Sequence, residues 1–239
     1  MDTEAAVPER DRSPAADEAE PGERSRFAVL GGWLAPRLPV WWAQWRRTIL
    51  LALAGVAAMM LVSTFVLEPF QVPSGSMEGT LRVGDRVLVD KLAYRFGGTP
   101  RRGDVIVFDG DGSLTQESGT DFVKRVIGVG GDRITCCDAQ GRLLVNGHPL
   151  DETYLYPGDT PSRVPFDIVV PDGRLWVMGD HRDDSRDSRD HLGDPGGGTV
   201  PVGRVIGRAD WIGWPVGHWT RLRRPATFAG VPAPAGAHG

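Results

Sequence analysis

FQVPSGSMEGTL, residues 70–81, is the stretch at which the chain changes from an apolar segment to β-rich sequence. Pro73 biases Val72 toward an extended conformation, and Gly75 permits backbone angles that other residues resist. An extended run therefore reaches a tight turn that presents Ser76. A hydroxyl in such a turn can act as a nucleophile, with backbone N–H groups and the Ser74 hydroxyl facing an oxyanion. An ordinary Ser/Gly turn is the alternative.

Residues 48–67, TILLALAGVAAMMLVSTFVL, contain no charge and are long enough to cross a membrane. As an α-helix they would rise about 30 Å, roughly the thickness of the hydrocarbon core. Arg46 and Arg47 precede the segment and Glu68 follows it. Basic residues favour the cytoplasmic side, so we expect a single-pass anchor with a cytoplasmic N-terminus and the chain beyond Glu68 outside. A buried helix of a globular protein is the alternative.

The flanking segments have little capacity to form a core. Residues 1–47 comprise an acidic stretch rich in Ala, Pro and Arg and then an aromatic juxtamembrane segment, and we expect the acidic stretch to be disordered. Residues 225–239 are rich in Ala, Pro and Gly, which predicts a flexible C-terminal tail. The remaining residues, 68–224, are expected to form one extracytoplasmic domain.

The sequence of this domain indicates strands. A Gly-Asp turn precedes β-branched residues three times, at Gly84, Gly103 and Gly131, and no convincing helical period follows residue 67. We predict a mostly β domain of coiled, partly closed sheets on one N-terminal transmembrane helix.

Composition and local patterns exclude several functions. A net charge of −4 does not provide the excess of positive charge that nucleic-acid binding requires. The polar loop at residues 109–120 lacks the spacing and terminal glutamate of a calcium-binding loop.

Cys136 and Cys137 are the only cysteines, which excludes a zinc site built on further cysteines. Neighbouring cysteines bridge only through a strained ring, so we expect no disulfide between them.

Only two lysines, Lys91 and Lys124, are present, and arginine cannot serve as a base because it does not lose its proton in a protein. Lys124 lies among apolar residues in DFVKRVIG, residues 121–128, whereas Lys91 follows Asp90, a ready ion-pair partner. Burial lowers the pKa of a lysine and can make it a base for a serine. A lysine guarding a sheet edge is the alternative.

Three motifs resemble those of the type I signal peptidases, membrane-bound serine proteases that remove signal peptides. They are EPFQVPSGSM at residues 68–77, DFVKRVIG at 121–128 and MGDHRDDSRDSR at 178–189. The resemblance implies that Ser76 attacks, that Ser74 helps to stabilise the oxyanion and that Lys124 is the general base. In the third motif it implies that Ser185 hydrogen-bonds the lysine, that Asp187 pairs with Arg189, and that Gly179 and Asp180 lie at the floor of the site.

The sequence departs from the usual third motif at two positions. His181 and Asp184 stand where the family usually has asparagines, so the contacts of these two residues are left open.

The same resemblance implies a substrate and a location. The substrates would be signal peptides of exported preproteins, bound as a strand along the extended residues 68–73, which include Pro73. Pocket walls from Phe70, Val72 and Val123 would admit only small side chains at positions −1 and −3 from the cut. It implies no metal or organic cofactor, and it places the protein in the plasma membrane, near the export translocon.

Three other interpretations stay open at this point. The first is a Ser–His–Asp triad of Ser76, His181 or His191 and one of the many aspartates. The second is a metal site built from His181, Asp183 and His191. The third is a membrane-anchored binding module that has lost its activity.

Overall fold

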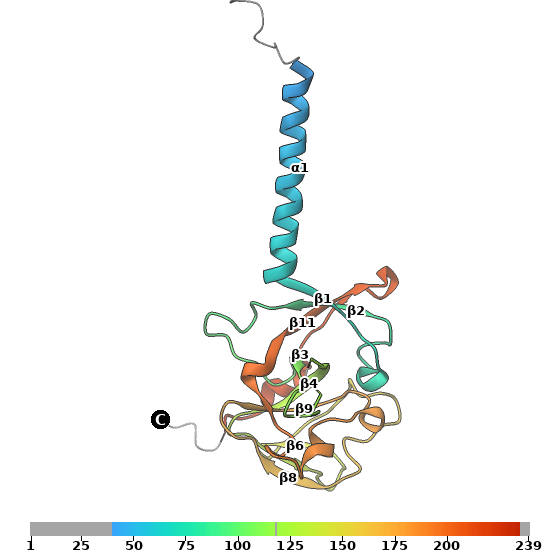
Figure 1. Ribbon diagram of the computed structural model, residues 1–239. Helices are drawn as coiled ribbons and strands as arrows, with labels where there is room; N and C mark the ends of the chain where they lie inside the picture. The colour runs from blue at the N-terminus through green and yellow to red at the C-terminus, as the bar shows by residue number, and fades with distance from the viewer. Residues whose placement is uncertain (1–39, 118, 235–239) are drawn as a thin grey trace, which may run out of the picture. The chain divides into compact units, whose positions relative to one another are not determined.

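The computed structural model describes residues 40–117 and 119–234 (Figure 1). The acidic stretch expected to be disordered lies outside these residues, as do the last five residues of the expected C-terminal tail. Helix α1 spans Val40–Phe65. It is followed by strands β1 (Leu67–Gln71), β2 (Arg86–Asp90), β3 (Val105–Asp109), β4 (Asp121–Val129), β5 (Arg133–Cys136), β6 (Leu144–Val145), β7 (His148–Pro149), β8 (Phe166–Val169), β9 (Arg174–Met178), β10 (Val200–Pro201), β11 (Val205–Trp214) and β12 (Thr220–Arg221).

Six short 3-10 helices lie between and after these strands in the described part of the chain. They are η1 (Gly75–Met77), η2 (Arg182–Asp184), η3 (Ser188–His191), η4 (Val202–Arg204), η5 (Val216–His218) and η6 (Ala226–Gly230).

Helix α1 contains the predicted apolar span. Its segment Gln44–Phe65 is long and apolar enough to cross a membrane, and none of that segment is buried inside the protein. This exposure argues against the core helix of a globular protein and is compatible with a membrane anchor. The helix ends two residues earlier than the predicted span, because Leu67 pairs with Asp90 as the first residue of β1.

The larger sheet is antiparallel throughout, in the order β1-β2-β11-β3-β4-β9-β10, with β12 added to β11. In Figure 1, β3, β4 and β9 follow one another across it. The prediction of a mostly β domain is confirmed. The sheet is open, however: β1 and β10 end it, and the described residues contain no pairing between them. β10 has two residues, and Pro201 has no N–H with which to extend the ladder.

A smaller sheet, in the order β7-β6-β5-β8, forms a second part of the domain. Ile134 of β5 and Leu143 before β6 are fully buried in a core cluster that also contains Trp176 of β9. At the end of β5, Cys136 and Cys137 are joined by a disulfide, so the expectation that they would not be bridged is wrong. Strain in the covalent ring is not the only contribution, because Cys136 is also held in place by its pairing with Phe166 of β8 and by burial.

The ordered domain continues past residue 224, the predicted boundary. Phe228 and Val231 are buried in the same core cluster as Trp176, and the Phe228 ring stacks on Tyr154 at a centroid distance of 6.2 Å. Asn146 Nδ2 donates to the carbonyl oxygen of Pro232 at 3.0 Å. The expected flexible tail therefore does not begin at residue 225, because two apolar side chains in an otherwise small-residue segment are enough to attach it to the core.

Candidate active site

The turn that carries Ser76 is held from both sides. Before it, the Val72 N–H donates to Asp85 O at 2.8 Å, and the Gly84 N–H donates to Val72 O at 2.9 Å. After it, Met77 is buried in a cluster of apolar side chains from β2, β3 and β11. Ser76 lies in η1 with only 8% of its surface exposed, and its Oγ is 3.3 Å from Ser74 Oγ. The two predicted hydroxyls are therefore neighbours in a rigid turn.

Lys124 lies in β4 with its side chain turned inward, so it is not the solvent-exposed lysine expected of a guarded sheet edge. It pairs with Ile106 of β3 and is 3% exposed. Its Nζ donates to Ser185 Oγ at 3.0 Å. Burial lowers the pKa of the Lys124 amine to about 8, and the nearby Asp187 carboxylate offsets only part of that effect. The amine can therefore be neutral near physiological pH.

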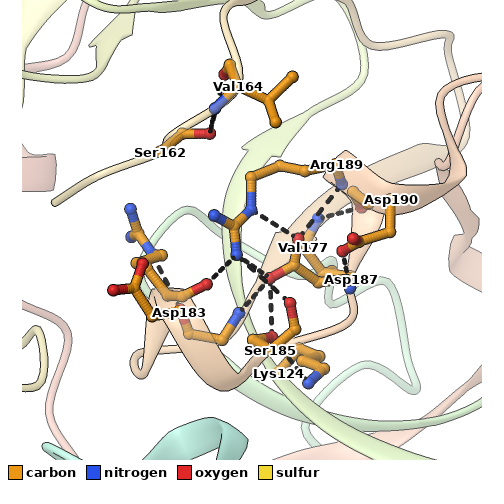
Figure 2. A network of polar contacts seen from close by, with 12 residues as sticks. Lys124, Ser162, Val164, Val177, Asp183, Ser185, Asp187, Arg189 and Asp190 are labelled. Carbon is orange, nitrogen blue, oxygen red and sulfur yellow. Dashed lines mark hydrogen bonds and ion pairs between the residues drawn. The ribbon is translucent and has the colours of Figure 1, made fainter. Parts of the chain in front are cut away.

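Behind the lysine, a network of polar side chains fixes Ser185 (Figure 2). Ser185 Oγ donates to Asp187 Oδ2 at 2.7 Å, and the Gly179 N–H donates to the same oxygen at 3.0 Å. The Arg189 guanidinium binds both carboxylate oxygens of Asp187 at 2.9 Å. Burial alone would raise the pKa of Asp187, but the hydrogen bonds and charge of Arg189 lower it below its usual value. Asp187 therefore remains a carboxylate and an acceptor.

The loop after β9 also contacts the serine turn directly. A Cβ on Gly179 would lie 2.3 Å from both Ser76 O and Ser185 Oγ, so the close approach requires glycine. The His181 N–H donates to Ser76 O at 3.1 Å.

Asp180, next to Gly179, is fully buried. It accepts from Arg125 Nε at 2.8 Å, from Arg125 Nη2 at 2.6 Å and from Thr80 Oγ1 at 2.6 Å. This pair joins the loop after β9 to β4 at the residue that follows Lys124. Sequence reasoning missed the role of Arg125, although its position directly after Lys124 in the second motif was a usable signal.

A cavity of about 390 Å³ opens in front of the two hydroxyls and the amine. The structure brings seven predicted site residues to its wall: Phe70, Val72, Pro73, Ser74, Ser76, Val123 and Lys124. The five predicted supporting residues, Gly179, Asp180, Ser185, Asp187 and Arg189, do not line it and belong instead to the hydrogen-bonded network behind the lysine.

Two strand edges meet at this cavity. In the described chain β1 pairs with β2 alone. Residues 121–124 of β4 pair with β3 on one side, and pairing with β9 on the other side starts only at Arg125. Each edge therefore leaves backbone N–H and C=O groups available to an added strand.

Asp184 and Arg186 also line the cavity, and sequence reasoning did not place them there. A Cβ on Gly75 would lie 3.0 Å from Asp184 Oδ2, which shows how closely this carboxylate approaches the serine turn. The departure from the usual asparagine at position 184 was the available signal.

The histidines considered for a triad have other contacts. The His181 ring stacks on Tyr156 at a centroid distance of 4.0 Å, and its Nδ1 lies 3.9 Å from Glu78 Oε2. His191 Nδ1 lies 2.6 Å from Asp194 Oδ2. His181 reaches Ser76 through its backbone, so this arrangement does not favour a histidine base.

Comparisons with known proteins give the family of the chain. The family model described as signal peptidase, peptidase S26, matches residues 42–214. Signal peptidase I of Mycobacterium tuberculosis strain H37Rv is 41% identical over 223 residues, with 74% of this chain and 75% of the relative covered. Signal peptidase I of Pseudomonas aeruginosa strain PAO1 is 33% identical over 201 residues, with 66% and 69% covered. A crystal structure of a signal peptidase I from Enterococcus faecalis V583 is 26% identical, covers 46% of this chain and 95% of its own, and has a TM-score of 0.34.

The family match and these relatives define a serine-type peptidase. The chain belongs to the signal peptidase family, peptidase S26.

Proposed function

We propose that this protein is a membrane-anchored serine endopeptidase that cleaves signal peptides from exported preproteins through a Ser76–Lys124 dyad. The observation that carries the proposal is that a buried lysine, with its pKa lowered to about 8, lines the same cavity as the Ser76 hydroxyl. The names of the relatives, signal peptidase I, support the substrate class.

In the proposed reaction, Ser76 Oγ attacks the scissile carbonyl carbon while neutral Lys124 Nζ accepts the hydroxyl proton. The resulting oxyanion accepts a hydrogen bond from Ser74 Oγ, which lies 3.3 Å from Ser76 Oγ in the resting site. Lys124 then gives its proton to the leaving amine, and the acyl-enzyme forms. Lys124 next takes a proton from water as the water oxygen attacks the acyl carbon. The ammonium then gives this proton to Ser76 Oγ as the ester C–O bond breaks, which restores the hydroxyl and the neutral amine.

The network behind the lysine supports this role by directing the amine. Ser185 Oγ donates its proton to Asp187, so its oxygen is left to accept from Lys124 Nζ. A neutral amine that donates one N–H to Ser185 keeps its lone pair free for the Ser76 proton. We infer that Asp187 and Arg189 act through Ser185 and do not contact the substrate.

The two free edges at the cavity support binding of the substrate as an extended strand between residues 70–73 and residues 121–124. In a strand, side chains −1 and −3 point the same way, while −2 points to the opposite side. The apolar wall of Phe70, Val72 and Val123 would therefore receive the −1 and −3 side chains and select small ones, as in Ala-X-Ala.

The location follows from α1. The 22-residue segment Gln44–Phe65, which is predominantly apolar, is compatible with one membrane span. With Arg46 and Arg47 at its start, we propose that the N-terminus is cytoplasmic and that the domain after Glu68 is extracytoplasmic, near the export translocon.

The test is cleavage of a model preprotein by the full chain in detergent, with the products mapped by mass spectrometry. Wild type should cut at one site after Ala-X-Ala, and Ser76→Ala should leave the preprotein intact. Ser162→Ala is the matched control. The Ser162 hydroxyl bonds only with the backbone of Val164 among the described residues, so this variant should retain full activity. No cleavage by wild type would favour the inactive binding module, and cleavage by Ser76→Ala would exclude Ser76 as the nucleophile.

A further inference from the structure

A second cavity, of about 460 Å³, lies away from the active site at one edge of β11. β3 pairs with this strand as far as Arg208, and β12 pairs with it from Trp211. The cavity opens at the residues between these two pairings. Its wall combines Asp104, Arg208, Asp210, Arg221, Arg223 and Arg224, and we call it the arginine cavity.

The charges of the arginine cavity do not cancel. Arg208 binds Asp210 through Nε at 2.6 Å and Nη2 at 3.1 Å. Arg224 binds Asp104, whose second oxygen also accepts from Tyr94 Oη at 2.8 Å. Each carboxylate is therefore matched by one arginine.

Arg221 and Arg223 are left over. Both are exposed, and neither forms an ion pair with a carboxylate within residues 40–117 and 119–234. Two unmatched guanidinium groups converge on one cavity in a protein whose net charge is −4. A local excess of positive charge of this kind is opposite to the overall balance of the chain and points to an anionic ligand.

The geometry of the arginines selects the kind of anion. A guanidinium is planar and presents paired N–H donors that match the oxygens of phosphate. An exposed aromatic side chain lies beside the cavity: Trp211, which follows Asp210 of the wall, is 42% exposed. The Arg221 guanidinium lies over the Trp211 ring at 5.9 Å. Tryptophan beside arginine is the combination found where proteins meet the headgroup layer of a membrane.

We propose that the arginine cavity binds a phosphate group, and that the exposed Trp211 beside it makes the phosphate of an anionic lipid headgroup its ligand. The proposal does not depend on the dyad, because the arginine cavity shares no wall residue with the active-site cavity.

The experiment uses the full chain in uncharged detergent and measures binding by titration calorimetry. The probes are short-chain phosphatidylglycerol, short-chain phosphatidylcholine and inorganic phosphate. We expect phosphatidylglycerol to bind more tightly than phosphatidylcholine, whose headgroup has no net charge. Binding should be largely lost in 1 M salt, where the Debye length falls to about 3 Å.

The test variant is Arg221→Gln/Arg223→Gln, which removes the two unmatched charges. Each arginine near an anionic surface contributes about fivefold in affinity, so the double variant should bind phosphatidylglycerol roughly thirtyfold more weakly. The matched control is Arg82→Gln/Arg95→Gln, which removes the same charge from exposed positions outside the arginine cavity. All four side chains are exposed, so both variants should unfold at the wild-type temperature.

Tighter binding of phosphatidylglycerol than of phosphate, lost in the test variant, supports a lipid headgroup site. Equal binding of both, lost in the same variant, supports the phosphate site with a soluble anion as its ligand. The proposal is overturned if the test and control variants weaken binding equally, or if neither weakens it.

Discussion

At the scale of single residues, the burial of Lys124 determines when the proposed base can work. Below its pKa of about 8 the amine is protonated and cannot accept the Ser76 proton, so activity should rise with pH through about 8 and then level off. A histidine base would place that rise near ~6.5. The measurement is kcat/KM for a model preprotein between pH 5 and pH 10, at about half-unit steps.

Substitution of the lysine tests the same residue. Lys124→Arg should abolish cleavage, because a guanidinium does not lose its proton. Lys91→Arg is the matched control, since Lys91 Nζ forms a half-exposed ion pair with Glu68 at 2.9 Å that arginine can keep. An active Lys124→Arg enzyme would contradict the dyad.

Asp187 links the site to the stability of the fold. Its pKa is lowered in the folded state, so its contribution is present above the unfolded value of ~3.9 and is lost as pH falls through the folded pKa. Asp187→Asn leaves the nearly buried Arg189 without its partner, which should cost about 3–5 kcal/mol in the free energy of unfolding near neutral pH.

Urea unfolding at a series of pH values checks this prediction. The difference between wild type and Asp187→Asn should shrink as pH falls through the folded pKa of Asp187. Asp172→Asn, at an exposed turn position, should change stability by less than about 0.5 kcal/mol. A difference that persists unchanged into strong acid would mean that the Asp187 charge is not the cause.

At the scale of elements, the open edges of β1 and β4 determine the proposed specificity. Overpacking a methyl-sized pocket costs ~1–3 kcal/mol, so replacing Ala by Leu at −1 should slow cleavage roughly ten- to hundredfold. The same change at −2 should have little effect. The measurement is a preprotein series varied at −1, −2 and −3, with cut sites mapped by mass spectrometry.

A change in the pocket wall provides the matching test on the enzyme. Val123→Ala removes two methyl groups from the wall and enlarges the pocket, so it should reduce the discrimination between Ala and Leu at position −1 of the substrate. Val129→Ala, at the other end of β4, should leave the discrimination unchanged. If wild type cleaves Ala and Leu equally at −1, the pocket assignment is wrong.

At the scale of the whole molecule, the segment after residue 224 is part of the folded domain. Phe228 is buried against Tyr154, so Phe228→Ala should lower the free energy of unfolding by about 3–5 kcal/mol. Phe96→Ala removes a ring that is 94% exposed and should change stability by less than about 0.5 kcal/mol. The check is urea unfolding of the two full-chain variants. If both substitutions change the free energy of unfolding equally, the folded domain ends at residue 224 as predicted.

The proposed orientation is a second prediction at this scale. Because Arg46 and Arg47 precede the apolar segment, protease added outside intact cells should digest the domain after Glu68 and spare the residues before the span. Antibodies against the two ends of the chain distinguish the fragments. Digestion of the N-terminal segment alone would reverse the topology.

The sequence by itself determined the apolar span, the predominance of strands and the family. These depend on composition, on period-two patterns and on contiguous motifs, all of which act over a few residues. Residue types also singled out Lys124, because only two lysines exist and only one lies among apolar neighbours.

Only the tertiary structure decided what surrounds those residues. Ser185 lies 61 residues from the lysine that it contacts, and Asp180 lies 55 residues from Arg125. The open sheet, the burial of Phe228, the Cys136–Cys137 bridge and the convergence of Arg208 with Arg221 and Arg223 were not anticipated from the sequence. Each depends on strand register and on packing between distant segments, and local propensity contains no information about which distant segment will be the partner.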